Sequence, residues 1–329
     1  MIYMSLNRSQ LGLMRRFKKG NDVFQATLGV QKGKWFSSFT KVPHEISDKI
    51  HMEIIKCIQQ VQAINPLVHC ITNRVTPQKM ANSLLAFGAS PAMIDNPDEV
   101  EEFAQLSSVT YFNLGLHTSQ VDNIKIIEKI RTELKKEKFL LVVDPLAVGA
   151  TKYRTSIIKN MLLKCQPNII KGNVSEIQYL DKEVFLGKGV DSNTNSVTED
   201  FQLVNTAKNV ALKYNSVVVV TAKKDIIVSP FLSEVAIVNL DVPILTKVTG
   251  TGCTVGALCA AAIAAYPQNS FVASVAAILL YMSAAFKAYQ TETFPGSLHD
   301  KLIDNIYFFA NNPKLLNFQN LDIYSSKET

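Results

Sequence analysis

Two short, almost unbroken apolar runs constrain the fold of this chain most strongly. Residues 139–143 read Phe-Leu-Leu-Val-Val, and residues 217–221 read Val-Val-Val-Val-Thr. Strands without polar alternation are typical of parallel sheets in which helices cover both faces. Segments with a helical spacing of apolar residues lie between such runs, so strands and helices alternate along the chain. The pattern predicts an α/β fold with a mainly parallel central sheet between two helical layers.

Spacing also predicts where each element lies. Strands are expected at residues 67–71, 109–114, 139–143, 168–170 and 217–221. Helices are expected at residues 44–63, 76–86, 96–106, 121–137, 155–164, 174–180 and 201–214, and a loop at 88–91. Because little sequence separates the further β-type runs, they can pair only as antiparallel neighbours, which predicts an antiparallel edge on the sheet. These runs are 226–228, 235–238 and 244–248.

Positive charge is concentrated at the start of the chain. The 329 residues carry a formal net charge of +6, whereas residues 1–41 hold eight Lys or Arg against Asp22 alone, a net +7 that leaves −1 for the rest. We therefore expect a basic, disordered extension over 1–41 and a single domain over 42–329. A nearly neutral body offers no nucleic-acid surface. Residues 1–14 lack the apolar run of a secretory signal, so a cytoplasmic location is expected, with an organelle presequence as the alternative.

The cysteines and the most apolar segments exclude two further classes of protein. The five cysteines form no C-x-x-C pair, which suits a reducing compartment and gives no zinc signature. Residues 255–265 and 271–285 are the most apolar stretches, and each is too short to span a bilayer. They are expected to be core helices, with no membrane association.

A loop of small residues opens directly into the first of these helices. Residues 247–253 read Lys-Val-Thr-Gly-Thr-Gly-Cys, and Pro267 must stop the Ala-rich helix that follows. The first amides of a helix lack intrahelical partners and favour negative charge, so a phosphate is the expected guest, with Cys253 beside it. An ordinary tight turn before a buried helix explains the loop equally well.

Polar and charged residues follow the other predicted strands. In open α/β sheets, ligands bind at the carboxyl ends of the strands. Each residue alone has a plainer role, as a turn cap, a first-turn acid or a solvated charge. Together they supply the oxygen ligands that Mg²⁺ prefers and donors for phosphate oxygens. The residues are Asn73, Asp144, Lys171, Glu176 and Thr221.

Several ordered motifs give the chain a resemblance to a known family. It looks like hydroxyethylthiazole kinase, a member of the ribokinase-like superfamily, over roughly residues 45–310. Ordered motifs are far more specific than one loop. The matching stretches are 66–73, 85–93, 144–150 with Arg154, 172–176, 246–253 and 295–297.

The resemblance implies a fold, a reaction and an assembly. The expected fold is a ribokinase-like three-layer sandwich. The expected reaction is the ATP- and Mg²⁺-dependent phosphorylation of the hydroxyethyl group of 4-methyl-5-(2-hydroxyethyl)thiazole, a step of thiamine salvage. Family members are trimers with the thiazole pocket at the subunit boundary, so a homotrimer is expected here.

The resemblance also assigns roles to individual residues. Met93 and Gly250 fall on thiazole-binding positions, and Asp144 and Glu176 on the magnesium side. The ATP-side positions are Asn73, Lys171 and Thr221. Cys253 matches the position beside the transferred phosphate, where a helix start is expected to lower the thiol pKa and make it a base.

The chain departs from the family pattern in two places. Lys171 stands where the family usually has Arg, which keeps the charge but loses the bidentate geometry. Residues 221–225 read Thr-Ala-Lys-Lys-Asp where the family usually has Thr-Gly-Glu-x-Asp. Both departures lie on the nucleotide side of the expected site.

Other functions stay open from the sequence. Pyridoxal and hydroxymethylpyrimidine kinases belong to the same superfamily and are alternatives, but they lack the Ala-Ser-Pro-Ala-Met run that this chain has at residues 89–93. A non-catalytic nucleotide-binding relative would explain the departures on the nucleotide side. Alternatively, Cys253 could be the nucleophile of a hydrolase, paired with His69 or His117.

Overall fold

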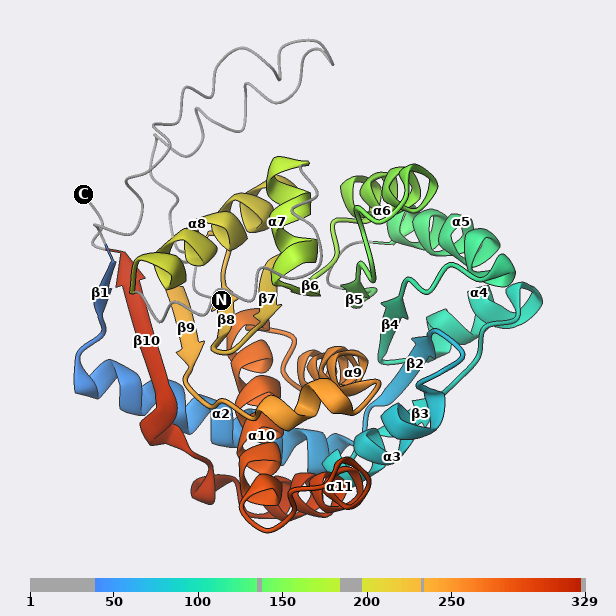
Figure 1. Ribbon diagram of the computed structural model, residues 1–329. Helices are drawn as coiled ribbons and strands as arrows, with labels where there is room; N and C mark the ends of the chain where they lie inside the picture. The colour runs from blue at the N-terminus through green and yellow to red at the C-terminus, as the bar shows by residue number, and fades with distance from the viewer. Residues whose placement is uncertain (1–38, 135–137, 184–196, 232–233, 327–329) are drawn as a thin grey trace, which may run out of the picture.

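The computed structural model describes residues 39–134, 138–183, 197–231 and 234–326, which form a ten-stranded sheet with helices on both faces (Figure 1). The strand order is β1-β10-β9-β8-β7-β6-β5-β4-β2-β3. The parallel strands are β2 (Leu67–Ile71), β3 (Ser90–Ala92), β4 (Val109–Asn113), β5 (Leu141–Asp144), β6 (Ile169–Asn173) and β7 (Val217–Thr221). The antiparallel edge consists of β8 (Asp225–Val228), β9 (Glu234–Val238), β10 (Leu321–Ser326) and β1 (Phe39–Lys41).

Two helical layers enclose the sheet (Figure 1). One layer consists of α2 (His44–Ile64), α3 (Pro77–Phe87), α9 (Thr251–Ala265), α10 (Ser270–Tyr289) and α11 (Pro295–Asn311). The other consists of α4 (Pro97–Leu106), α5 (Thr118–Glu133), α6 (Lys152–Cys165), α7 (Val174–Lys182) and α8 (Val197–Tyr214). This arrangement confirms the predicted three-layer α/β fold.

The run at 139–143 shows why its residues are apolar without alternation. Leu140 and Val142 are buried against the layer that contains α9 and α10. Leu141 and Val143 point the other way and are buried against the layer that contains α5 and α6. Successive side chains of a strand point to opposite faces, and here both faces are covered, so every position is selected for apolar packing.

Residues 244–248 are not the strand that the sequence predicted. Residues Pro243–Lys247 form a 3₁₀ helix, in which the Thr246 hydroxyl donates to the carbonyl oxygen of Pro243 at 2.8 Å. The consecutive side chains of Ile244 and Leu245 both pack against buried apolar clusters, so they do not alternate as in a strand. The strand predicted at 244–248 was therefore wrong. Pro243, which has no N–H for a ladder, begins the 3₁₀ helix that stands there instead. The open edge of β9 is taken by β10 instead.

Short edge elements are further differences from the sequence prediction. The expected loop at 88–91 contains the start of β3, which pairs with β2. Residues 39–41, expected in the basic extension, form β1 and pair with β10. The remainder of that extension lies outside the described residues.

Helix α10 passes through the interior of the domain. By length and composition alone it could cross a membrane, but 89% of its most apolar window is buried inside the fold. Its neighbours are α9, α11 and α2. The helix therefore has the surroundings of the core helix that the sequence predicted.

Candidate active site

The parallel strands end at one edge of the sheet, where helix α9 begins. The strands β2, β4, β5, β6 and β7 run in the same direction, so the residues at their carboxyl ends share that edge. Helix α9 packs against β2, β4, β5 and β6, with the small-residue loop before it. The predicted phosphate loop and the residues at the strand ends therefore meet.

Asp144, at the end of β5, forms a buried ion pair with Lys171 of β6. The Nζ atom of Lys171 lies 3.2 Å from Oδ2 of Asp144, and the two side chains are 5% and 1% exposed. The Tyr111 hydroxyl donates to the same oxygen at 3.3 Å. The other carboxylate oxygen, Oδ1, is buried without a hydrogen-bond partner. Such a buried acceptor is suited to a ligand that the folded chain alone does not supply.

The charge on Lys171 is maintained by its acidic neighbours. Burial lowers the pKa of Lys171, but the charges of Asp144 and Glu176 oppose this and leave the pKa above its ordinary value. A Cβ added to Gly252 would lie only 3.0 Å from Nζ of Lys171. The ammonium group is therefore directly beside the first turn of α9.

Glu176 is held by two backbone amides at the start of α7. Its Oε2 accepts the N–H of Asn173 at 2.8 Å, while the Asn173 side chain accepts the N–H of Glu176 at 2.9 Å, which forms a capping box. Its Oε1 accepts the N–H of Ala147 at 2.8 Å. Burial and the nearby charge of Asp144 raise the pKa of Glu176. The carboxyl group is thus fixed close to the Asp144–Lys171 pair.

Helix α9 starts without a side-chain cap. Gly250 is its N-cap residue and has a φ of +85°, a left-handed conformation that favours glycine. A Cβ at this position would lie 2.8 Å from Cγ2 of Thr76. Because no side chain satisfies the first amides of α9, they remain donors for an anion in front of the helix.

Cys253, in the first turn of α9, is contacted by two asparagines. The Nδ2 atom of Asn113 lies 3.4 Å from its Sγ atom, and Nδ2 of Asn73 lies 3.6 Å away. The two amides also bond to each other, Asn73 Nδ2 to Asn113 Oδ1, at 2.9 Å. Burial and the charge of Asp144 raise the pKa of Cys253, against the opposing effect of Lys171. The expected lowering of this pKa was wrong because burial outweighs the helix start.

Thr221 ends β7 beside the last residue of β6. Its hydroxyl donates to the carbonyl oxygen of Gly172 at 3.4 Å. The turn that follows is closed by the buried carboxylate of Asp225, which accepts the N–H of Ala222 at 3.0 Å. Burial raises the pKa of Asp225 to about 7. The turn that departs from the family pattern is therefore fixed by a buried acid.

Met93 follows β3, and its half-buried side chain packs against the core layer that contains α9. The segment after it is held by histidines: Nε2 of His69 is 2.9 Å from the carbonyl oxygen of Ile94. Nε2 of His117 is 3.2 Å from the carbonyl oxygen of Thr72 and 3.4 Å from Asp95 Oδ2. These contacts give both histidines a loop-holding role, which does not favour the cysteine hydrolase.

The structure brings most of the predicted site residues into one cluster. It joins Asp144, Lys171, Glu176, Asn73, Cys253 and the loop of Gly250, with Thr221 on the adjoining strand. Met93 lies at the same edge, next to β2. Sequence reasoning missed Asn113 because the predicted strand ran on to residue 114, and missed Tyr111 because a buried aromatic residue looks like core. An asparagine at the end of an apolar strand was the available signal for Asn113.

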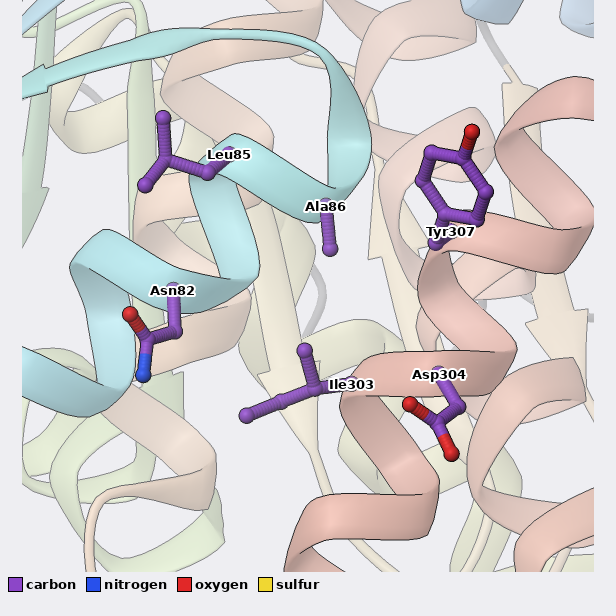
Figure 2. A pocket seen from close by; sticks show the side chains of 6 residues that line it. All are labelled: Asn82, Leu85, Ala86, Ile303, Asp304 and Tyr307. Carbon is purple, nitrogen blue, oxygen red and sulfur yellow. The ribbon is translucent and has the colours of Figure 1, made fainter.

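Two surface pockets lie on the α3/α11 side of the molecule. One of about 540 Å³ lies between α3 and α11 and contains no residue of the cluster (Figure 2). Its lining residues are Asn82, Leu85, Ala86, Ile303, Asp304 and Tyr307. A second, of about 390 Å³, adjoins Gly250 and contains the loop residues before α9. Its lining residues are Lys79, Lys247, Val248, Thr249, Pro295, Gly296 and His299. The chemistry at the strand ends, not pocket size, identifies the candidate site.

Comparisons with known proteins agree on one family. The model of the hydroxyethylthiazole kinase family matches residues 58–312. A hydroxyethylthiazole kinase from Clostridium kluyveri is 40% identical over 256 residues, which cover 78% of this chain and 91% of the relative. Hydroxyethylthiazole kinase 2 from Clostridium botulinum is 39% identical over 256 residues, with 77% and 93% covered.

A solved structure extends the likeness to three dimensions. The hydroxyethylthiazole kinase protein from Pyrococcus horikoshii superposes with a TM-score of 0.68 at 33% sequence identity, covering 78% of this chain and 93% of that one. The three-layer fold is thus ribokinase-like, as the resemblance implied. The chain therefore belongs to the hydroxyethylthiazole kinase family.

Proposed function

We propose that this protein transfers the γ-phosphoryl group of ATP to the hydroxyethyl group of 4-methyl-5-(2-hydroxyethyl)thiazole, as in thiamine salvage. The observation that carries the proposal is the buried Asp144–Lys171 pair beside the uncapped start of α9. A phosphate chain needs cations, N–H donors and acidic metal ligands within one small volume. Family membership and this arrangement support the same reaction.

The substrate roles that we propose are those that the family resemblance implies. We assign Met93 and Gly250 to the thiazole, as the family resemblance implies: Met93 follows β3, which pairs with β2, and Gly250 lies against Thr76, in the segment after β2. We assign ATP contacts to Asn73, Lys171 and Thr221.

Asp144 and Glu176 fit a magnesium site that substrate phosphates complete. Mg²⁺ is usually held by one or two carboxylates together with waters and phosphate oxygens. The buried Oδ1 of Asp144 has no partner and is the open acceptor of the site. Among the described residues, no group of three or more His, Cys, Asp or Glu side chains could hold a metal ion. When bound, the ion supplies positive charge that neutralises the phosphate oxygens.

The chain's own groups have separate tasks in the transfer. The first amides of α9 and the ammonium of Lys171 bind the phosphoryl oxygens, where negative charge spreads in the transition state. Cys253 Sγ, in its thiolate form, is the proposed acceptor for the proton of the substrate hydroxyl. Its raised pKa leaves little thiolate at neutral pH, but a loose phosphoryl transfer depends mainly on positioning and electrostatics. Asn73 and Asn113 hold the sulfur in place by their amide donors.

We further propose a homotrimer with the thiazole pocket at the subunit boundary, located in the cytoplasm. The family resemblance supports the trimer. Light scattering coupled to size-exclusion chromatography would give three times the mass of one chain if it is correct. A monomer that is active at assay concentration would contradict the shared pocket.

An ATP-consumption assay with a small panel of alcohols tests the proposed reaction. The thiazole alcohol should be phosphorylated with far higher kcat/KM than pyridoxal or hydroxymethylpyrimidine. Preference for pyridoxal or the pyrimidine would identify the protein as a different kinase of the same superfamily. No turnover of any alcohol would favour a non-catalytic relative. Asp144→Asn and Glu176→Gln should both raise the magnesium concentration needed for half-maximal activity. Unchanged magnesium dependence would remove them from the metal site.

A further inference from the structure

Arg154 connects the two loops that follow β4 and β5. Its Nη1 atom donates to the carbonyl oxygens of Leu114 at 2.6 Å and Leu146 at 3.0 Å. Its Nη2 atom donates to the carbonyl oxygen of Gly115 at 3.0 Å. The backbone N–H of Arg154 in turn bonds to the N-cap hydroxyl of Thr151 at 3.2 Å, which fixes the residue in the first turn of α6. One planar guanidinium therefore bridges segments that are distant in sequence.

Both loops contain a backbone conformation that requires support. Leu116 has a φ of +54°, and Ala147 has a φ of +57°. Left-handed residues other than glycine persist only where the surrounding structure holds them in place. Hydrogen bonds from a charged donor are stronger than neutral ones, and Arg154 gives three of them to residues within two positions of Leu116 and Ala147.

The loop after β4 determines where Asn73 can lie. A Cβ on Gly115 would be 2.7 Å from Cβ of Asn73, so backbone and side chain are already in close contact. The amide of Asn73 contacts Sγ of Cys253. A shift of the Gly115 peptide would therefore move a group that touches the reacting centre.

The loop after β5 determines where Glu176 can lie. Arg154 binds the carbonyl of Leu146, and the next residue, Ala147, donates its N–H to Oε1 of Glu176 at 2.8 Å. The hydroxyl of Thr155, also in α6, accepts the N–H of Gly149 at 2.9 Å in the same loop. Burial lowers the pKa of Arg154, and the charge of Glu176 opposes this, so the two groups interact electrostatically as well.

We propose that Arg154 is a positioning residue for phosphoryl transfer, which aligns the magnesium-side Glu176 and the nucleotide-side Asn73 through the two loops. It acts through backbone carbonyls and does not touch the substrates. The inference rests on the roles proposed above for Glu176 and Asn73. Groups that orient metal ligands from behind commonly affect activity or metal affinity by about 10- to 100-fold when they are removed.

Three variants and a matched control test this role. Arg154→Gln and Arg154→Gly remove the charged fork, and Arg154→Lys keeps the charge with fewer donors. Lys164→Gln removes another cation of α6, which pairs with Glu128 at the surface. The measured quantities are kcat, the KM values for ATP and for the thiazole alcohol, the magnesium concentration at half-maximal activity, and the melting temperature.

The Gln and Gly variants should lose about 10- to 100-fold in kcat/KM for ATP and need more magnesium, with a nearly unchanged KM for the thiazole alcohol. Arg154→Lys should recover part of the loss, and added guanidinium ion should partly restore Arg154→Gly. Lys164→Gln should match the wild type in every measurement.

Two results would overturn the inference. One is an Arg154→Gln enzyme with wild-type ATP and magnesium dependence. The other is a uniform loss that follows the melting temperature and does not respond to guanidinium. Glu176→Gln separates this from failure of the metal assignment: if that variant keeps wild-type magnesium dependence, the metal role fails. If it shifts the dependence and Arg154→Gln does not, only the positioning role fails.

Discussion

The Nζ atom of Lys171, within β6, and the Oδ2 atom of Asp144, at the end of the adjacent parallel strand β5, lie 3.2 Å apart and are almost fully removed from water. Each charge is acceptable in the interior only because the other is present. The pair thus links the stability of the sheet edge to the charge balance of the proposed phosphate site.

Removing one partner should therefore destabilise the protein strongly. Lys171→Met leaves the Asp144 carboxylate without its cation, and we expect a loss of about 3 kcal/mol in the free energy of unfolding. Urea unfolding of the single variants and of the Lys171→Met/Asp144→Asn double variant gives the coupling between them. The double variant should regain much of the loss, because no unpaired charge remains. Equal stability of Lys171→Met and wild type would contradict this expectation. It would mean that the attraction between the two charges only balances the cost of dehydrating the Lys171 ammonium group.

The thiol at position 253 predicts an alkaline rise in rate. Because burial raises the pKa of Cys253, the base form becomes more populated as the pH increases above neutrality. We expect kcat to rise across that range, Cys253→Ala to lower kcat by roughly tenfold, and Cys253→Asp to keep or exceed the neutral-pH activity. The pH profile of initial rates for the three proteins is the measurement. Wild-type turnover by Cys253→Ala would show that this side chain is not the base.

Asp225 should make stability depend on pH between about 4 and 7. Its folded-state pKa is about 7, whereas an unfolded aspartate has a pKa of about 3.9. The neutral carboxyl therefore favours the folded state at low pH. That advantage is lost as the pH rises from about 4 to about 7, by at most about 4 kcal/mol.

Asp225→Asn is the comparison that isolates this effect. Its amide oxygen can still accept the N–H of Ala222, but it does not ionise. Lys171 and Asp241 also act on the carboxyl, the first lowering and the second raising its pKa. The wild-type unfolding free energy minus that of the variant should fall across the window. A flat difference would mean that the carboxyl is already ionised in the folded protein at low pH.

Gly256 in α9 should not tolerate a methyl group. A Cβ there would lie 2.6 Å from both the Cε2 atom and the hydroxyl oxygen of Tyr111. Gly256→Ala should cost about 1–3 kcal/mol of stability through overpacking. It should also lower activity, since Tyr111 donates to Asp144. Gly296→Ala is the control, because a Cβ at this position meets nothing within 4 Å. We expect it to change the melting temperature only slightly.

The interior of the fold was predictable because apolar runs determine it. The apolar runs at 139–143 and 217–221 are buried on both faces of the sheet, so their composition is informative without any partner. The short strands β1, β3 and β10 have no such signal, since pairing with a neighbour makes them strands. The 3₁₀ helix Pro243–Lys247 contains apolar residues that are also common in strands, and only its packing in the fold distinguishes a 3₁₀ helix from a strand there.

The residues of the site were easier to predict than its electrostatics. Asp144 and Lys171 follow apolar runs of the sequence, and this position predicts that they lie close together. The depth at which Cys253 is buried depends on the surrounding layers and has no signature in the chain, so the direction of its pKa shift was mispredicted. The hydrogen bonds from Arg154 to backbone carbonyl oxygens could not be predicted either, because every residue has such an oxygen and no particular side chain marks the partner.

The antiparallel pairing of β1 with β10 brings opposite ends of the described chain together, with Phe39 opposite Ser326 (Figure 1). A short peptide could therefore join these positions, so that the polypeptide is circularised and reopened at an exposed loop. Four strands, β9, β8, β7 and β6, separate this pair from β5 in the sheet order, so such a permuted protein would keep the proposed phosphate site intact. The same separation makes this edge a favourable place to attach a label or an affinity handle.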